Sequence, residues 1–338
     1  MRHLATDGIL DGRAVVEGRV TLDDMSRSNE VAMLAVDGEP KAVLKRRGVA
    51  VDDVDPLRAE VDCLGWLAAC ASTAAIAPDI ITTFDDIVVT AVGGSSTLSE
   101  ALAVADRDEH IRLLRGLGRS LAVLHSADPD RTLLVPRRPW VLDVVNGNVP
   151  HTLVNDPGIE ALVDRVNRHP ELVAAIQRLA ASWTTAGVVH GDIKFDNVVV
   201  TDSSAGCRPL DQGVVDLVLV DWELAGLGPA VWDLAGVVVG MIVPQILEAD
   251  VEAGLIDLVD VERDVAPMFD TYRASADAKT DDAELVTATV VRMVQTSFQL
   301  CAMRHLDPGH DESSIRVFDA AAAMASVSSG HDELAMVS

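Results

Sequence analysis

Two short polar segments near the middle of the chain carry residues that could do chemistry. The first contains Asp192 and Asn197, and the second contains Asp221, which follows an apolar run. A carboxylate can orient a hydroxyl group, and separate carboxylate and amide oxygens are suitable ligands for Mg²⁺. Phosphoryl transfer needs this combination, because it depends on positioning and charge neutralisation more than on covalent help from the protein. We therefore expect Asp192 to face an acceptor hydroxyl, and Asn197 and Asp221 to hold Mg²⁺ on a nucleotide.

Short apolar runs flank these residues in the sequence. Residues 187–189 and 198–200 predict strands on either side of the first segment, and residues 214–220 predict a third strand that ends just before Asp221. Strand, polar loop, strand, turn and strand then form one continuous unit. The alternative is that the carboxylates lie in ordinary solvated turns, which requires the whole string to match by chance.

The two segments resemble the catalytic loop and metal segment of the aminoglycoside phosphotransferase and choline kinase-like superfamily, which shares the protein-kinase fold. The resemblance lies in 190–192 (His-Gly-Asp) with Asn197, and in 221–223 (Asp-Trp-Glu) followed by Asp233. It implies that Asp233 braces the catalytic loop through backbone N–H groups. Gly191 stands where regulated protein kinases carry an arginine that reads a phosphorylated activation loop, which implies a constitutively active site.

The resemblance also implies an α+β fold of the bilobal, protein-kinase-like type. Residues 1–92 would form the N-lobe, a small antiparallel sheet with one helix that binds the nucleotide. Residues 93–338 would form a larger, mainly helical C-lobe with the catalytic loop, the metal site and the substrate region. The last residues, 326–338, are small and polar and are expected to form a disordered tail.

The beginning of the chain predicts an antiparallel sheet. Residues 15–21, 30–36 and 42–45 are typical of strands, and residues 22–29 would be the loop over the nucleotide. This loop lacks a glycine motif, so an ordinary hairpin turn is the alternative. Its hydroxyl and backbone N–H groups would cap the phosphates, and the residues concerned are Ser26, Ser28 and Asn29.

A lysine on the third strand is the candidate for gripping the nucleotide phosphates. Lys45 would pair with Glu60 on a helix that begins near Pro56. The alternative is an exposed lysine at a strand end and a solvated glutamate. Backbone groups near Thr90 and Val92, at the connection between the lobes, would meet the adenine.

The remaining chain predicts mostly helices. Helices are expected over 109–126, 159–168 and 170–186, and from Asp233 to about residue 325, whereas residues 127–158 read as a loop. His125, at the end of the first of these helices, is expected to be structural rather than catalytic.

Composition limits the partners and the compartment. The net charge of −26 works against nucleic acids and anionic membranes as partners, because both are polyanions. It would attract a cationic substrate, or it could serve solubility alone. The four cysteines have neither metal-site spacing nor a disulfide framework, which favours the cytoplasm. No apolar run is expected to approach the length of a membrane helix, and no signal peptide is expected at the start.

These features predict transfer of the γ-phosphoryl group of ATP, rather than GTP, to an alcohol, with Lys194 neutralising charge during transfer. One candidate acceptor is a small molecule, such as an aminoglycoside-like antibiotic or another natural product. The other is a Ser or Thr of a precursor peptide in a lanthipeptide-type pathway, because Lys194 resembles the lysine of Ser/Thr protein kinases. A pseudokinase scaffold is disfavoured, because no catalytic position is missing. The sequence leaves the oligomeric state open.

Overall fold

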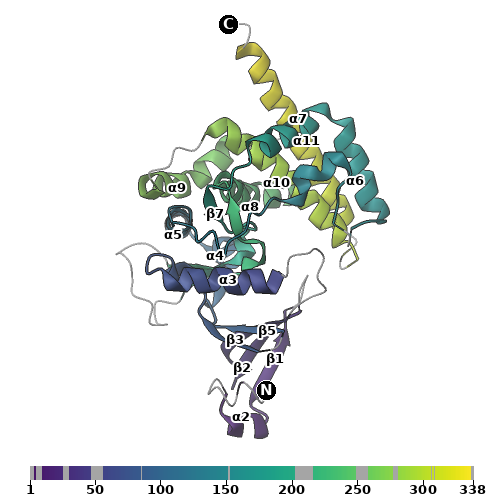
Figure 1. Cartoon of the computed structure of the whole chain (residues 1–338). Coiled ribbons are helices and arrows are strands. Elements are labelled where there is room, and N and C mark those ends of the chain that lie inside the picture. Colours follow the sequence, from purple (N-terminus) through teal and green to yellow (C-terminus); the bar gives the residue numbers. More distant parts are fainter. Residues whose placement is uncertain are drawn as a thin grey trace.

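The computed structural model of the chain has a small β-rich lobe and a larger, mainly helical lobe (Figure 1). This confirms the predicted α+β, bilobal fold class. The structure describes residue 4 and residues 10–25, 30–46, 56–84, 86–150, 153–201, 216–248, 258–276, 281–305, 307 and 309–335.

The N-terminal lobe is built on a five-stranded sheet with the strand order β1-β2-β3-β5-β4. Its neighbouring strands are antiparallel, and its members are β1 (Val20–Asp24), β2 (Glu30–Val36), β3 (Glu39–Arg46), β4 (Ile80–Phe84) and β5 (Ile87–Thr90). Helix α3 (Pro56–Ala69) follows β3 and lies between the sheet and the C-terminal lobe (Figure 1). Leu34, Ala42 and Val89 belong to these strands, and their buried side chains form a small hydrophobic core on the sheet.

The first strand begins later than the sequence predicts. A strand was expected over 15–21, but residues 12–16 form the short helix α2 (Gly12–Val16), which Asp11 caps by accepting a hydrogen bond from the Arg13 N–H. Gly18 then adopts a left-handed conformation with φ of 71°, which ends the helix and turns the chain into β1. The strand extends to Asp24, so residues 22–24 of the expected loop over 22–29 belong to β1.

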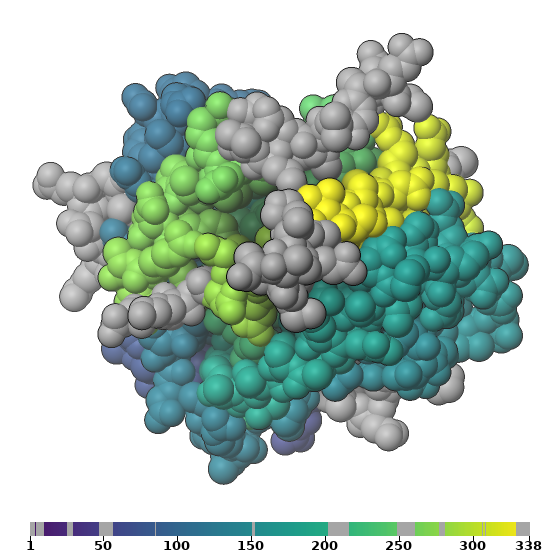
Figure 2. Space-filling view, turned by 90° about the horizontal axis from the view of Figure 1, so that it is seen from above, coloured from purple at the N-terminus to yellow at the C-terminus, as the bar shows by residue number. Residues whose placement is uncertain are grey.

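The C-terminal lobe contains helices that surround short strands. The small strands are β6 (Ser96–Thr97), β7 (Gly187–Val189), β8 (Val198–Val200), β9 (Leu217–Leu219) and β10 (Gly226–Gly228). The helices are α4 (Leu98–Val104), α5 (Arg107–His125), α6 (Pro157–Arg168), α7 (Pro170–Ser182), α8 (Val231–Glu248), α9 (Leu258–Ala276), α10 (Asp282–Ala302) and α11 (Gly309–Ala335). Figure 2 shows one face of this lobe, on which α6 and α7, in teal, lie beside α11, in yellow.

Two segments of this lobe are more ordered than the sequence predicts. Residues 127–158 were expected to be a loop, but Trp140–Asn146 is a 3₁₀-helix that buries Val141, Leu142 and Val144 in the helical core. A disordered tail was expected over 326–338, but α11 continues to Ala335. The alanine-rich stretch at 320–323 favours this long helix, and residues 336–338 lie outside the described residues.

Helix α8 forms the centre of the C-terminal lobe. It is long and apolar enough to span a membrane by length and composition alone, so the expectation that no apolar run approaches the length of a membrane helix is wrong. In this fold 56% of that window is buried, and α8 packs against α9, α10 and α11. Its apolar character is therefore explained by its place in the core. It also carries Trp232 and Asp233, which are completely buried and point to the loop described next.

The connection between the lobes runs from β5 to β6. Strand β6 pairs with β8, so the chain has entered the sheet of the C-terminal lobe by Ser96. Position 94 requires glycine, because the Cβ atom of any other residue would collide with the Val200 carbonyl oxygen. The expected lobe boundary at residues 92 and 93 falls within this connection and stays an interpretation.

Candidate active site

The loop between β7 and β8 brings Asp192 and Asn197 into direct contact. The side-chain amide nitrogen of Asn197 donates to the Asp192 backbone carbonyl (2.9 Å) and to Asp192 Oδ2 (3.2 Å). Both side chains are almost completely buried. The amide nitrogen of Asn197 is thus used as a donor, and its amide oxygen is the atom suited to a metal ion.

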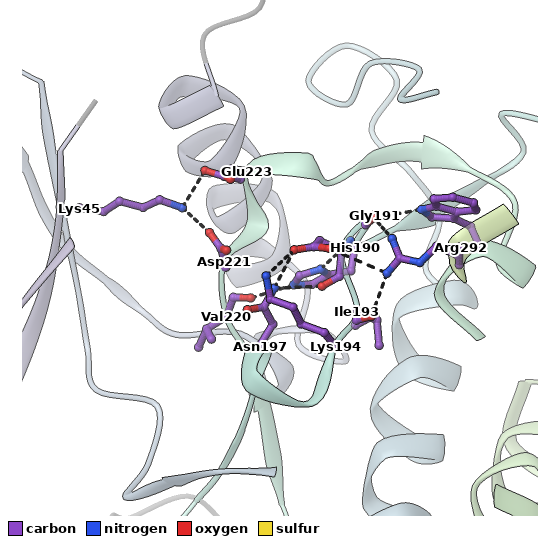
Figure 3. A network of polar contacts seen from close by, with 12 residues as sticks. Lys45, His190, Gly191, Ile193, Lys194, Asn197, Val220, Asp221, Glu223 and Arg292 are labelled. Atoms are coloured by element: carbon purple, nitrogen blue, oxygen red, sulfur yellow. Dashed lines mark hydrogen bonds and ion pairs between the residues drawn. The ribbon is translucent and has the colours of Figure 1, made fainter. Parts of the chain in front are cut away.

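Lys194 also contacts the Asp192 carboxylate. Its ammonium group donates to Asp192 Oδ2 over 2.9 Å, and the lysine side chain is half exposed (Figure 3). Burial alone would raise the pKa of Asp192, but the positive charges of Lys194 and Arg292 outweigh burial and hold that pKa below its ordinary value. Asp192 is therefore ionised at neutral pH, as a group that takes a proton from a hydroxyl must be.

The third predicted residue, Asp221, lies two residues after the end of β9. The backbone N–H of Val220 donates to the Asn197 carbonyl over 2.9 Å, which fixes this strand end against the catalytic loop. Asp221 has a left-handed backbone with φ of 68° and ψ of 61°, and this conformation is uncommon for a non-glycine residue. The turn directs its carboxylate toward the N-terminal lobe, as Figure 3 shows.

Lys45 joins the two lobes through three carboxylates. Its ammonium nitrogen lies 2.8 Å from Glu60 Oε2, 2.5 Å from Asp221 Oδ1 and 3.2 Å from Glu223 Oε2. Burial alone would lower the pKa of Lys45, but the three carboxylates outweigh burial and raise it. The lysine is only 8% exposed, so the alternative of a solvated lysine at a strand end is wrong.

The charge balance of this cluster favours an additional cation. One ammonium group faces three carboxylates, and the excess of negative charge favours a second cation near Asp221. Asn197 and Asp221 are hard oxygen ligands of the kind that Mg²⁺ prefers, and Mg²⁺ commonly takes few ligands from the protein itself. When bound, such an ion would neutralise charge on the phosphates of a nucleotide. The metal role of both residues stays a prediction.

Asp233 braces the catalytic loop, as the resemblance implied. Its two carboxylate oxygens accept hydrogen bonds from the backbone N–H groups of His190 (2.7 Å) and Gly191 (2.9 Å). His125 Nε2 lies 3.1 Å from the same carboxylate, and His125 Nδ1 lies 3.0 Å from the Tyr272 hydroxyl. His125 therefore contacts the brace, which agrees with a structural role.

Gly191 cannot carry a side chain in this loop. Its φ is 84°, and a Cβ atom would lie 2.3 Å from the backbone carbonyl oxygen of Leu224. Both the backbone conformation and the close approach of the metal segment thus require glycine. The catalytic loop and the metal segment are in contact at this position.

Other predicted binding residues are less defined. Thr90 ends β5 and pairs with Val43, and Val92 lies in the connection between the lobes. Contacts of these residues with adenine stay predictions. The predicted phosphate-loop residues Ser26, Ser28 and Asn29 lie outside the described residues.

Two residues of the site were missing from the sequence-based candidates. Glu223 contacts Lys45, and its signal was present in the Asp-Trp-Glu motif. Arg292 on α10 donates hydrogen bonds to two backbone carbonyls of the catalytic loop. Its position in a mostly apolar helix gave no local signal, because only the packing of α10 brings it to the loop.

We expect the contributions of Lys45 and Glu60 to be non-additive. In Lys45→Met the buried Glu60 loses its main partner, so Glu60→Gln should add little to the loss that Lys45→Met causes. The coupling should be in the range of about 0.5–3 kcal/mol for residues in contact. ATP affinity and kcat/KM of the four proteins in the cycle would measure it. The pair Arg58 and Asp62, an exposed arginine and a partly exposed aspartate on the same helix α3, is the control, and its substitutions should change little. Independent effects of Lys45 and Glu60 would contradict the functional pair.

We expect Asp233→Asn to destabilise the fold by about 2–5 kcal/mol, because one loop N–H group would face an amide NH₂ inside the protein. Burial alone would raise the pKa of Asp233, but His125, His190 and the backbone donor outweigh it, so the pKa is lowered from 3.8. The wild-type stabilisation is thus fully present above pH 3.8 and is lost as pH falls through the lower, folded-state pKa.

Urea unfolding at several pH values tests this prediction. The difference between wild type and Asp233→Asn should be constant at neutral pH and should shrink below about pH 4. Asp270→Asn, an exposed change on α9, is the control and should leave stability nearly unchanged. A difference that grows on acidification would contradict an ionised brace.

Comparison with known proteins shows a family and a group of solved structures that this chain resembles. The model of the family described as "Phosphotransferase enzyme family" matches residues 21–267. No curated protein matches this chain. Solved structures match it over nearly the whole length at low sequence identity.

Three of these structures illustrate the range. The Plasmodium vivax ethanolamine kinase is 10% identical, with a TM-score of 0.57, and the match covers 94% of this chain and 84% of that one. The choline kinase of Streptococcus pneumoniae is 12% identical, with a TM-score of 0.56 and coverage of 95% and 99%. The aminoglycoside phosphotransferase of Streptomyces rimosus, in complex with ADP and streptomycin, is 16% identical, with a TM-score of 0.52 and coverage of 86% and 98%. At these identities the likeness supports the fold alone.

Proposed function

Since this chain belongs to the phosphotransferase enzyme family, we propose that it transfers the γ-phosphoryl group of ATP, with Mg²⁺, to a hydroxyl group of a small cationic molecule. It is an enzyme that moves phosphate to a hydroxyl acceptor. The observation that carries the proposal is the single polar network in which Lys194 and Asn197 contact Asp192 while Lys45 contacts Asp221 (Figure 3).

Each residue of this network has a role in the proposed reaction. Asp192 orients the acceptor hydroxyl and takes up its proton as the new O–P bond forms. Asn197 and Asp221 would hold Mg²⁺, and Lys45, kept in place by Glu60, would bind the nucleotide phosphates. Lys194, 2.9 Å from Asp192, would offset negative charge on the group in transfer. ADP leaves with the electron pair of the broken P–O bond.

Charge and similarity both favour a small cationic acceptor. The chain carries a net charge of −26, and an acidic protein attracts cations over long range. Solved proteins that share the fold include kinases named for ethanolamine and choline, and one that holds streptomycin. Ethanolamine, choline and streptomycin all combine a hydroxyl group with positive charge, so an acceptor of this kind is the first candidate.

A panel of acceptors tests the proposal. We expect ADP release from Mg²⁺–ATP to accelerate with at least one of ethanolamine, choline, 1-amino-2-propanol, kanamycin and streptomycin, and the phosphorylated product to appear by mass spectrometry. GTP in place of ATP would identify the preferred nucleotide. Absence of nucleotide binding and turnover across the panel would favour a scaffold without catalysis and would contradict the proposal.

The contact between Lys194 and Asp192 favours a second candidate. A lysine two residues after the catalytic aspartate resembles Ser/Thr protein kinases, and here the two side chains are in direct contact. The acceptor would then be a Ser or Thr hydroxyl of a precursor peptide in a lanthipeptide-type pathway. A Ser/Thr-rich peptide belongs in the same panel, and its preferential phosphorylation would select this candidate.

Salt dependence should report how the acceptor is captured. For a cationic acceptor, we expect kcat/KM for the acceptor to fall as ionic strength rises, while kcat changes little, because salt screens long-range attraction more than contacts in a buried site. Uncharged ethylene glycol is a control acceptor for the same assay. If kcat/KM is flat with saturating Mg²⁺–ATP, the negative charge serves solubility, and the peptide acceptor becomes the first candidate.

A further inference from the structure

A buried arginine contacts the backbone of the catalytic loop. Arg292, on α10, is 5% exposed. Its Nη1 donates to the Gly191 carbonyl over 3.2 Å, and its Nη2 donates to the Ile193 carbonyl over 2.9 Å. Gly191 and Ile193 are the residues on either side of Asp192. One planar guanidinium group thus binds the backbone before and after the catalytic carboxylate (Figure 3).

The same guanidinium group faces the carboxylate itself. Arg292 Nη2 lies 3.9 Å from Asp192 Oδ1, which is too long for a hydrogen bond but close enough for strong electrostatic attraction at a buried site. Within the described part of the chain, the hydrogen bonds to this carboxylate fall on Oδ2, from Lys194 and Asn197. Arg292 therefore places positive charge beside Asp192, whose Oδ1 accepts no hydrogen bond from the described residues.

Helix α8 holds the arginine in this position. The guanidinium carbon lies 4.7 Å from the centre of the Trp232 ring, and the Trp232 indole N–H donates to the Gly191 carbonyl over 3.0 Å. Gly236 makes room for the contact: a Cβ atom there would lie 2.4 Å from the Ile193 carbonyl oxygen and 2.9 Å from Arg292 Nη2. The guanidinium group has little space to move.

Stability alone does not explain this residue. Val291, Met293 and Val294 surround it on α10 and are buried apolar side chains. A well-packed apolar residue generally stabilises such a core as well as a buried charge does, because a buried charge loses its hydration. The polar groups that compensate for the lost hydration of Arg292 are the two carbonyls and the carboxylate of the catalytic loop.

We propose that Arg292 is a positioning residue for phosphoryl transfer, which fixes the backbone on both sides of Asp192 and holds a positive charge beside its carboxylate. This inference rests on the proposed role of Asp192. Arg292 acts through Asp192 and the loop and does not itself touch the reacting atoms.

Substitutions that separate charge from geometry test the inference. Arg292→Met removes both, and we expect kcat to fall about 100-fold, the scale of loss for a misplaced catalytic group, while Mg²⁺–ADP affinity stays within about threefold. Arg292→Lys keeps the charge but cannot bridge both carbonyls, so it should recover about tenfold of that loss. Arg304→Met is the matched control. Arg304 also binds a carbonyl and a carboxylate, those of Cys301 and Asp156, away from the loop, and its substitution should leave kcat unchanged.

The assay follows ADP release from Mg²⁺–ATP with water as the acceptor and with the panel compound that the wild type phosphorylates fastest. Wild-type kcat retained in Arg292→Met would overturn the inference, as would a fall of kcat and ADP affinity by equal factors. Equal activity of Arg292→Lys and Arg292→Met would overturn the role of the charge. If Arg292→Met does not fold, Gly236→Ala places a Cβ atom against both the Ile193 carbonyl oxygen and the guanidinium group. It disturbs their contact without removing the arginine, and it should lower kcat with little change in ADP affinity.

A readout without catalysis separates this inference from the proposed function. We expect hydrogen exchange of the backbone amides in 190–194 to become faster in Arg292→Met, with unchanged exchange in β3 and α3. If the wild type shows no turnover but this local change appears, the proposed function fails and the positioning contact stands. Unchanged exchange in 190–194 would overturn the positioning contact whatever the activity.

Discussion

Asp192→Asn should reduce kcat by about 10²–10⁴, the typical cost of removing a general base. The amide has nearly the shape of the carboxylate and can still accept a hydrogen bond from Lys194 or Asn197, which now contact Asp192 Oδ2. It cannot take a proton from an acceptor hydroxyl. Nucleotide binding should therefore stay nearly intact while transfer is lost. Single-turnover transfer and equilibrium binding of Mg²⁺–ATP measure the two properties separately.

The neighbouring Asp196→Asn is the control for this substitution. It makes the same chemical change in the same loop, but Asp196 is exposed whereas Asp192 is buried. We expect its kcat to stay within about threefold of the wild-type value, as for an ordinary surface change. Near-normal turnover in Asp192→Asn, or an equal loss in both variants, would show that the catalytic-loop assignment is wrong.

Asp221→Asn should abolish the dependence of nucleotide affinity on Mg²⁺ and reduce turnover by at least about 10³, because a hard divalent cation held by few protein oxygens needs this carboxylate. Asparagine tolerates the left-handed backbone observed at this position, so the fold should be preserved. Its amide oxygen can also still accept a hydrogen bond from Lys45. The change thus removes charge at the metal site and little else.

Titrating ATP with and without Mg²⁺ tests this prediction. The wild type should bind ATP more tightly when Mg²⁺ is present, and Asp221→Asn should give the same affinity in both conditions. Asp216→Asn, at the other end of the same strand, is a control of the same chemical type and should retain the Mg²⁺ effect. If Asp221→Asn responds to Mg²⁺ as the wild type does, the metal is held elsewhere.

The local parts of this site could be predicted from the sequence. Asp192, Asn197 and Asp221 lie in one supersecondary unit, so their spacing along the chain largely determines their spacing in the fold. Glu60 could be paired with Lys45 because the strand and helix that carry them follow each other. Their contact in the structure supports the predicted pair, whereas their effect on catalysis stays a prediction.

Arg292 could not be predicted in the same way. It lies about a hundred residues after the loop, and it reaches Gly191 and Ile193 only because α10 packs against α8. No local pattern distinguishes it from an arginine on a helix surface. The prediction of the first strand was wrong for a different reason. Val15 and Val16 have high strand propensity, but the Asp11 cap and the left-handed Gly18 favour a helical turn before β1.

The close approach of Gly191 to the Leu224 carbonyl restricts how this enzyme can evolve. In the regulated protein kinases that its motif resembles, an arginine at this position couples the catalytic loop to phosphorylation elsewhere. Here any side chain at 191 would collide with the backbone of the metal segment, so acquiring that arginine would first require a rearranged 222–225 turn. An arginine at 191 alone would therefore not give this enzyme switchable activity of the protein-kinase type.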